Sequence, residues 1–233
     1  MMPMLLRVCG IFTIRKILGI FSGKFAVSQL YGYEAPGKTT LGTEHSVNFS
    51  KTGGRLNFNL WQELASDKYE QNDMGYFTNN NYLDHGLWVG YKWIKPKSFY
   101  NNMYLNFNTY YSRRYMPGDY QNLNFNANIN GQLKSLWYVG LFTGYNSKGN
   151  DFYEPRVDGR VYKSPSSWII DTWFNTNRAK KFSSYVEIAF RYIKQFKGIS
   201  SDFSMSNKYR FNKKLTIGLD NSFQLRYNNV GFD

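Results

Sequence analysis

The stretch that decides the fold reads Asn122-Leu123-Asn124-Phe125-Asn126-Ala127-Asn128-Ile129-Asn130-Gly131-Gln132-Leu133. Every even position is an amide, and every odd position except Gly131 is apolar. Because successive side chains of an extended chain point to opposite faces, this alternation predicts a β-strand with one apolar face and one hydrogen-bonding face. Such a strand is typical of a soluble sheet that covers a core, and equally of the wall of a membrane barrel.

The same alternation recurs along the chain from about residue 23, in about eleven segments separated by turn residues. The expected strands are 24–33, 45–50, 55–64, 82–94, 102–112, 122–133, 136–145, 168–174, 185–193, 199–211 and 215–227. The segment 136–145 is apolar at both even and odd positions, so its facing stays open. No later stretch has a helical period, and the pattern therefore predicts an all-β protein.

The connections between these strands differ in length in a regular way. Long connections are expected at 34–43, 65–81, 113–121 and 146–167, and short ones at 51–54, 95–101, 131–135, 175–182 and 212–214. In an up-and-down sheet, alternate connections leave opposite ends, and one loop-rich end is typical of outer-membrane barrels. Several segments continue for about ten to thirteen residues, close to the roughly nine to eleven that cross a bilayer at barrel tilt. The sequence thus predicts an up-and-down antiparallel transmembrane β-barrel.

Composition agrees with this interpretation and excludes several others. Aromatic residues make up 19% of the 233 residues, and rings with polar tips suit a membrane interface. The mean hydropathy of -0.54 argues against helical spans, but a barrel whose alternate residues face water has a low mean as well. The net charge of +13 is scattered and no nucleic-acid motif accompanies it, so no nucleic-acid partner is expected.

Ten of the 29 basic residues lie in or next to the connections of the short-turn end. They are Lys51, Arg55, Lys95, Lys97, Lys134, Arg178, Lys180, Lys181, Lys213 and Lys214. Turn lysines commonly keep a surface soluble, and this interpretation is favoured over a specific anionic partner.

Two domains are expected, an atypical segment at 1–22 and a barrel domain at 23–233. The first segment is apolar but interrupted by Arg7, Arg15 and Lys16, and a signal peptide, an interfacial helix and an upstream strand all stay open. Bacterial barrels that are formed by a single chain have an even number of strands. The odd count here predicts that at least one closing strand is missing at the C-terminal side, so we expect a fragment.

Two loop motifs resemble a known family. They are Asn72-Asp73-Met74-Gly75-Tyr76, followed by Asn79-Asn80-Asn81, and Gly149-Asn150-Asp151-Phe152-Tyr153-Glu154-Pro155-Arg156. Over most of residues 23–233 the chain resembles the barrel of a Bacteroidota family of unknown function, whose members carry an N-terminal module similar to family-9 carbohydrate-binding domains. The resemblance implies an outer-membrane location and a link to carbohydrate. This chain lacks that module, so the module and the missing strands are expected partners.

The candidate site lies in the long loops. Its members are aromatic or basic side chains that a sugar could stack on or bond to: Tyr69, Tyr76, Phe77, Phe152, Tyr153 and Arg156. The same aromatic rings could instead pack inside the barrel mouth, and this alternative is favoured. We expect Leu123, Phe125, Ala127 and Ile129 to face lipid. We expect Asn124, Asn126, Asn128, Glu187 and Arg191 to face the lumen.

No catalytic or metal site is predicted. The two histidines, His45 and His85, fall on the apolar positions of their strands without a serine motif, so interfacial packing is favoured over catalysis. Acidic residues in two loops (Asp67, Glu70 and Asp73; Asp151, Glu154 and Asp158) could bind calcium, but their spacing matches no dedicated calcium loop. The only cysteine, Cys9, has no partner for a disulfide, and no Cys/His spacing resembles a zinc site. We expect no cofactor.

Two functions remain open at this stage. The first is a non-enzymatic outer-membrane barrel that anchors or passes a ligand, glycan-related by the resemblance. The second is a soluble all-β carbohydrate-binding protein that uses the loop aromatics. They differ in whether the protein partitions into membranes.

Overall fold

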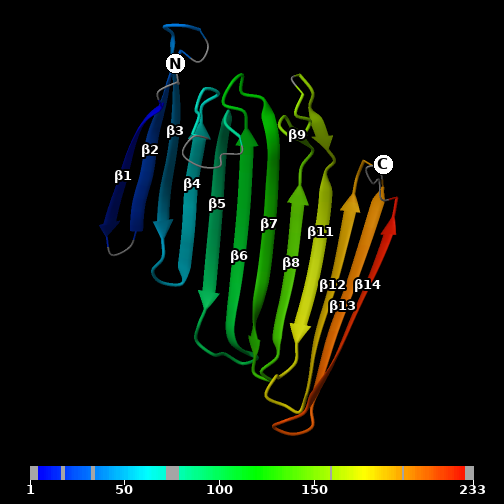
Figure 1. Ribbon diagram of the computed structural model, residues 1–233. Coiled ribbons are helices and arrows are strands. Elements are labelled where there is room, and N and C mark those ends of the chain that lie inside the picture. Colours follow the sequence, from blue (N-terminus) through cyan, green and yellow to red (C-terminus); the bar gives the residue numbers. More distant parts are fainter. Residues whose placement is uncertain are drawn as a thin grey trace. The chain divides into compact units, whose positions relative to one another are not determined.

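The computed structural model describes residues 5–16, 19–32, 35–71, 79–157, 159–195 and 197–228, with side chains from residue 19 onward. Every regular element among them is a strand (Figure 1). No helix of the described residues is long and apolar enough to cross a membrane. The chain divides into two compact units, 1–89 with 109–123 and 149–164, and 90–108 with 124–148 and 165–233. Each unit is described by itself below.

The strands follow one another in the sheet as they do in the chain. The elements are β1 (Leu5–Lys16), β2 (Gly19–Tyr31), β3 (Thr39–Lys51), β4 (Leu56–Ala65), β5 (Tyr82–Trp93), β6 (Tyr100–Arg113), β7 (Tyr120–Leu133), β8 (Tyr138–Asn146), β9 (Gly149–Asp151), β10 (Tyr162–Ser164), β11 (Ser167–Asn175), β12 (Phe182–Ile193), β13 (Gly198–Arg210) and β14 (Thr216–Tyr227). The order β1-β2-β3-β4-β5-β6-β7-β8-β11-β12-β13-β14 forms a 12-stranded up-and-down sheet, and β9 pairs with β10 separately.

The eleven expected strands are confirmed as β2 to β8 and β11 to β14. Residues 5–16 form β1, an antiparallel strand beside β2, which is the upstream-strand alternative left open for the segment 1–22. The β9–β10 hairpin within the predicted loop 146–167 was not expected. The expected barrel is also corrected in one respect. Among the described residues the strand order ends at β1 and at β14, so the sheet is open rather than closed.

In the first unit, the long connection after β4 packs on β2 and β3. Ala26, Ala65 and Tyr69 are fully buried and form a small core, against which Tyr82 packs. Gly42 on β3 lets this connection approach closely, since a Cβ there would lie 2.3 Å from the Tyr69 Cα. Burial of a small apolar cluster thus holds the loop-rich part of this unit.

In the second unit, strand register decides which side chains share a face. Asn126 lies opposite Gly144 and Asn128 opposite Phe142, whereas Phe125 lies opposite Tyr145. Because directly opposed residues of an antiparallel pair project to the same face, the odd positions of β8 share a face with Phe125. The facing of β8, which the sequence left open, is therefore set by its pairing with β7.

The two faces of the second unit differ in chemistry. On one face, large apolar side chains are exposed on neighbouring strands: Leu105, Phe107, Phe125, Leu141, Trp168, Ile170 and Phe190. On the other face, the amide of Asn106 donates to Asn128 Oδ1 over 3.0 Å, and that of Asn108 donates to Asn126 Oδ1 over 2.8 Å. Tyr138 donates its hydroxyl proton to Asn130 Oδ1 over 2.6 Å. The amides that the sequence places on one side are thus paired across strands.

Tryptophan side chains of the polar face pack over glycines. A Cβ on Gly140 would lie 2.1 Å from Trp173 Cζ2 in the second unit. In the first unit, a Cβ on Gly86 would lie 2.1 Å from Trp61 Cε2. Each glycine makes room for an indole ring that any larger residue would displace.

Candidate functional site in the long loops

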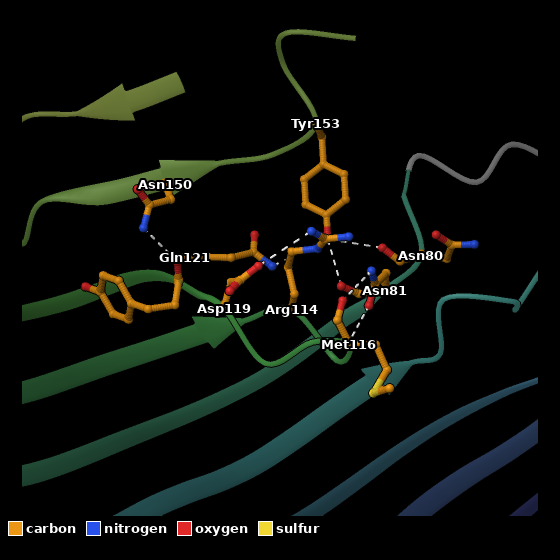
Figure 2. Close-up of polar contacts among 9 residues, drawn as sticks. Asn80, Asn81, Arg114, Met116, Asp119, Gln121, Asn150 and Tyr153 are labelled. Atoms are coloured by element: carbon orange, nitrogen blue, oxygen red, sulfur yellow. Dashed lines mark hydrogen bonds and ion pairs between the residues drawn. The ribbon is translucent and has the colours of Figure 1, made fainter. Parts of the chain in front are cut away.

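The hydroxyl of Tyr153 joins three segments of the first unit (Figure 2). It lies 3.1 Å from the main-chain oxygen of Asn80 and 2.9 Å from that of Asn81, and it accepts a bond of 3.4 Å from Gln121 Nε2. Burial raises the pKa of the Tyr153 hydroxyl above its usual value. The hydroxyl is therefore a neutral donor at physiological pH, and it holds the β9–β10 hairpin against the connection between β4 and β5.

The turn that presents Tyr153 is built by the preceding carboxylate. Asp151 Oδ1 accepts the main-chain N–H of Tyr153 over 2.9 Å and that of Glu154 over 3.0 Å. This is the local bonding by which aspartate initiates turns. The carboxylate of Asp151 is thereby bonded to the main chain of the turn that follows it.

Asn81 clamps the connection between β6 and β7 (Figure 2). Its Nδ2 donates to the Met116 oxygen over 2.9 Å, and its Oδ1 accepts the Met116 N–H over 2.8 Å. Asn81 is 7% exposed and has a φ of 60°, a left-handed conformation that asparagine tolerates better than most residues. Residue type and backbone conformation agree at this position.

Arg114 lies beside the same cluster. Its Nη1 is 3.6 Å from Asp119 Oδ2, and its guanidinium carbon is 5.0 Å from the centre of the Phe152 ring. The Nε atom of Arg114 is buried and has no hydrogen-bond partner among the described residues. One buried donor of the site is thus unpaired within the described part of the chain.

These side chains surround a cavity of about 590 Å³. Its lining consists of amides, guanidiniums and a few apolar groups: Asn79, Asn80, Asn81, Arg114, Phe152, Tyr153, Arg156, Val157, Gly159, Arg160 and Val161. Amides and guanidiniums suit a ligand rich in oxygen acceptors, and an aromatic ring offers a flat apolar contact. Such a lining can bind a ligand, and among its described residues no nucleophile has a base beside it.

The expected ligand-contacting residues have different positions in the structure. Phe152, Tyr153 and Arg156 line the cavity together. Tyr69 is fully buried, packs in the core with Ala26 and Ala65, and donates to Gln71 Oε1 over 3.0 Å, as the packing alternative describes. Tyr76 and Phe77 lie outside the described residues.

Sequence reasoning missed Asn81, Arg114 and Gln121 as members of this site. The contacts that gather them join segments far apart in the chain. The asparagine triplet 79–81 was the available signal, because it ends a long connection and does not fit a strand pattern.

The two histidines are linked through a glutamine in the first unit. Gln62 lies between them, with its Oε1 3.0 Å from His45 Nε2 and its Nε2 2.8 Å from His85 Nε2. The ring of His85 also lies 6.0 Å from that of Tyr111. Gln62 was missed although it is a polar residue at an apolar position of its strand. The arrangement is a hydrogen-bonded row, and both histidines use one nitrogen to bind the same amide.

The acidic residues do not gather into a metal site in the described part of the chain. No group of three or more histidine, cysteine or carboxylate side chains there could hold a metal ion. Asp73 and Asp158 lie outside the described residues.

The side chains expected to face lipid and lumen fall on opposite faces of the sheet. Asn126 lies opposite Gly144, Gly144 opposite Ile169, and Ile169 opposite Arg191, so these positions share one face. Glu187 lies on the same face, opposite Trp173. Leu123, Phe125, Ala127 and Ile129 alternate with the asparagines and project from the other face. What medium each face contacts stays a prediction.

Comparison with known proteins places the chain in a family. None of the curated proteins and none of the solved structures matches the chain. A family profile described as a domain of unknown function (DUF5916) matches residues 15–233, which is nearly the whole sequence. The chain belongs to this DUF5916 family of unknown function.

Proposed function

We propose that this protein is a non-enzymatic β-barrel protein of the bacterial outer membrane, which anchors or passes a ligand. The observation that carries the proposal is the contrast between the two faces of the second unit. Exposed rings such as Phe107 and Phe125 project from one face, and paired amides such as Asn108 and Asn126 from the other.

A sheet with water on both faces would not explain why one face is apolar and the other polar. A soluble sheet would bury its apolar face against a second layer, and the described residues of the second unit contain strands only. Lipid against the apolar face and water against the amides would satisfy both sides. Strand lengths support the same environment, since β6 and β7 have 14 residues each, enough to cross a bilayer at a tilt.

The two edge strands of the sheet, β1 and β14, need hydrogen-bonding partners in such a barrel. An open sheet in lipid would leave backbone groups of β1 and β14 unpaired, at a cost of several kcal/mol per group. Closure by further strands or by another chain is therefore part of the proposal.

The membrane part is tested by location. The chain is expressed with an outer-membrane signal in a bacterium that has an outer membrane, and membranes are washed with alkaline carbonate. We expect the protein to remain with the washed membranes. Recovery as a soluble monomer without detergent would contradict the proposal and favour a soluble all-β protein.

The ligand part rests on the loop cavity. Three arginines, Arg114, Arg156 and Arg160, share it with three asparagines and the Phe152 ring, which suits a glycan that carries acidic groups. The link to carbohydrate also follows from the resemblance to barrels that carry carbohydrate-binding modules.

Glycan binding is tested with the full chain in detergent micelles. Neutral and uronic-acid oligosaccharides are titrated, and the double variant Arg156→Gln/Arg160→Gln is compared with Arg55→Gln/Lys97→Gln, which removes two exposed cations outside the cavity. We expect binding of the acidic oligosaccharides to weaken about tenfold or more in the cavity variant only. Equal loss in both variants would show that net charge alone attracts the glycan.

A further inference from the structure

A second cavity, in the second unit, collects basic side chains. It has a volume of about 270 Å³ and lies where β11, β12, β13 and β14 approach their short connections. Its lining combines five cations with hydroxyl groups and one amide: Asn175, Arg178, Lys180, Lys181, Ser183, Ser184, Tyr185, Ser206, Lys208, Arg210 and Thr216. No carboxylate belongs to this lining among the described residues.

Strand register explains how the lining converges. Ser183 lies opposite Lys208, Tyr185 opposite Ser206, and Arg210 opposite Thr216. These positions therefore share one face near the strand ends. The connection 176–181 supplies the remaining cations next to them.

Hydrogen bonds to neutral groups hold the two arginines in place. Arg178 Nη2 donates to Asn175 Oδ1 over 2.7 Å, and Arg210 Nη2 donates to the main-chain oxygen of Arg178 over 3.4 Å. None of the five cations forms an ion pair in the described part of the chain. The two guanidiniums are thus oriented, and no carboxylate of the described residues neutralises the five charges.

Five like charges around a small cavity repel one another, and solvent screens them only in part. The five cations are exposed, as Lys95 and Lys97 on another short connection are. They differ in sharing a hollow with the hydroxyl groups of Ser183, Ser206 and Thr216. Arginine forks with hydroxyl donors are the groups that bind phosphate oxygens.

We propose that this cavity binds a phosphate-bearing anion. The site comprises Arg178, Lys180, Lys181, Lys208 and Arg210 as charges, with Ser183, Ser206 and Thr216 as hydroxyl donors. The phosphate comes from a free anion or from a lipid headgroup. The loop cavity and its ligand have no part in this assignment.

The test uses the full chain with two probes. Inorganic pyrophosphate is titrated by calorimetry into the protein in zwitterionic detergent. Phosphatidylglycerol binding is measured on the protein in nanodiscs with and without that lipid. Saturable pyrophosphate binding identifies a free anion as a source, and saturation by phosphatidylglycerol alone identifies the headgroup. Absence of both would overturn the proposal.

Three variants separate a built site from net charge. Arg178→Gln/Arg210→Gln should weaken binding of the responding probe at least about tenfold, while the control Lys95→Gln/Lys97→Gln should change it less than about twofold. Arg178→Lys/Arg210→Lys keeps the charge but loses both guanidinium forks. Its binding of the probe should be weaker than that of the control and stronger than that of the glutamine variant. Equal effects of the glutamine variant and its control would overturn the proposal. Circular dichroism of each variant confirms the fold before binding is compared.

Discussion

Asn108 Nδ2 on β6 donates a hydrogen bond of 2.8 Å to Asn126 Oδ1 on β7. One residue earlier on each strand, Phe107 and Phe125 stack on the opposite face with their ring centres 6.4 Å apart. The same pair of strands therefore carries a polar contact and an apolar contact back to back. Neighbouring residues of each strand therefore face different environments, and a shift of the strand pairing by one residue would exchange them.

The first prediction compares the two sides of β7. Phe125→Arg should lower the free energy of unfolding in liposomes by about 2 to 4 kcal/mol if the residue lies near the bilayer midplane, because an arginine there faces lipid. Asn126→Arg should cost about 1 kcal/mol, mainly the lost bond to Asn108. Equilibrium denaturation of the chain in liposomes measures both. Equal costs would contradict the proposed facing.

A second prediction concerns the glycine beneath a tryptophan. Gly140→Ala should destabilise the protein by about 1 to 3 kcal/mol, because the new Cβ would lie 2.1 Å from Trp173 Cζ2 and the ring must move. Gly218→Ala is the matched control, since its nearest atom would be 3.8 Å away. Trp173→Ala should remove most of the difference, and a double-mutant cycle of Gly140→Ala with Trp173→Ala measures that coupling.

A structural feature could be predicted from the sequence when it depends on residues close together in the chain, and could not when it depends on residues far apart. The faces of β7 follow from the alternation of Asn124 to Ile129, since the strand period of two acts within a few residues. The facing of β8 does not, because Tyr138 and Val139 suit either side and only pairing with β7 decides between them.

The role of Gly131 shows a further limit of the sequence. The sequence predicts a strand through Leu133 and also a connection that starts at Gly131, and β7 in fact continues to Leu133. A Cβ at Gly131 would lie 2.4 Å from the Asn102 oxygen, so glycine here serves a close approach within the sheet. The residue type is the same in both roles, and the local sequence cannot distinguish them.

The loop site depended on contacts of still longer range. Tyr153 was expected to contact a ligand or to pack, and the structure assigns its hydroxyl to Asn80 and Asn81. Residues so far apart in sequence meet only through the fold. The Phe152, Tyr153 and Arg156 group was predicted because these residues are neighbours in the chain, whereas Arg114 came from another connection.

A third prediction concerns the Asn81 clamp. Asn81→Ala removes both bonds to Met116 and places an alanine at a φ of 60°, so it should cost about 2 to 4 kcal/mol. Asn81→Gly removes the same bonds without the backbone strain and should cost about 1 kcal/mol less. Asn79→Ala, at an exposed neighbouring position, is the control and should be nearly neutral. Denaturant unfolding compares the three. A cost for Asn81→Gly as large as that for Asn81→Ala would show that strain contributes nothing.

The last prediction uses the pH dependence of the Tyr153 contact. Burial raises the pKa of this hydroxyl above the ordinary value of about 10. A folded-state pKa above the unfolded one means that the folded protein binds the proton more tightly. The contribution to stability is therefore complete below about pH 10 and is lost as pH rises through the folded-state pKa.

Tyr153→Phe removes both the proton and the bonds to Asn80 and Asn81. The variant should be less stable than the parent at pH 8, by about 1 to 2 kcal/mol, and this difference should shrink as the pH rises above about 10. Other tyrosines and lysines titrate in both proteins, so only the difference between the two unfolding free energies reports on Tyr153. Tyr162→Phe, at an exposed tyrosine of the same hairpin, serves as the control for removing a hydroxyl that does not bond to Asn80 and Asn81. A difference for Tyr153→Phe that grows with pH would mean that the buried hydroxyl is held as the anion, with its pKa lowered by Arg114 rather than raised by burial.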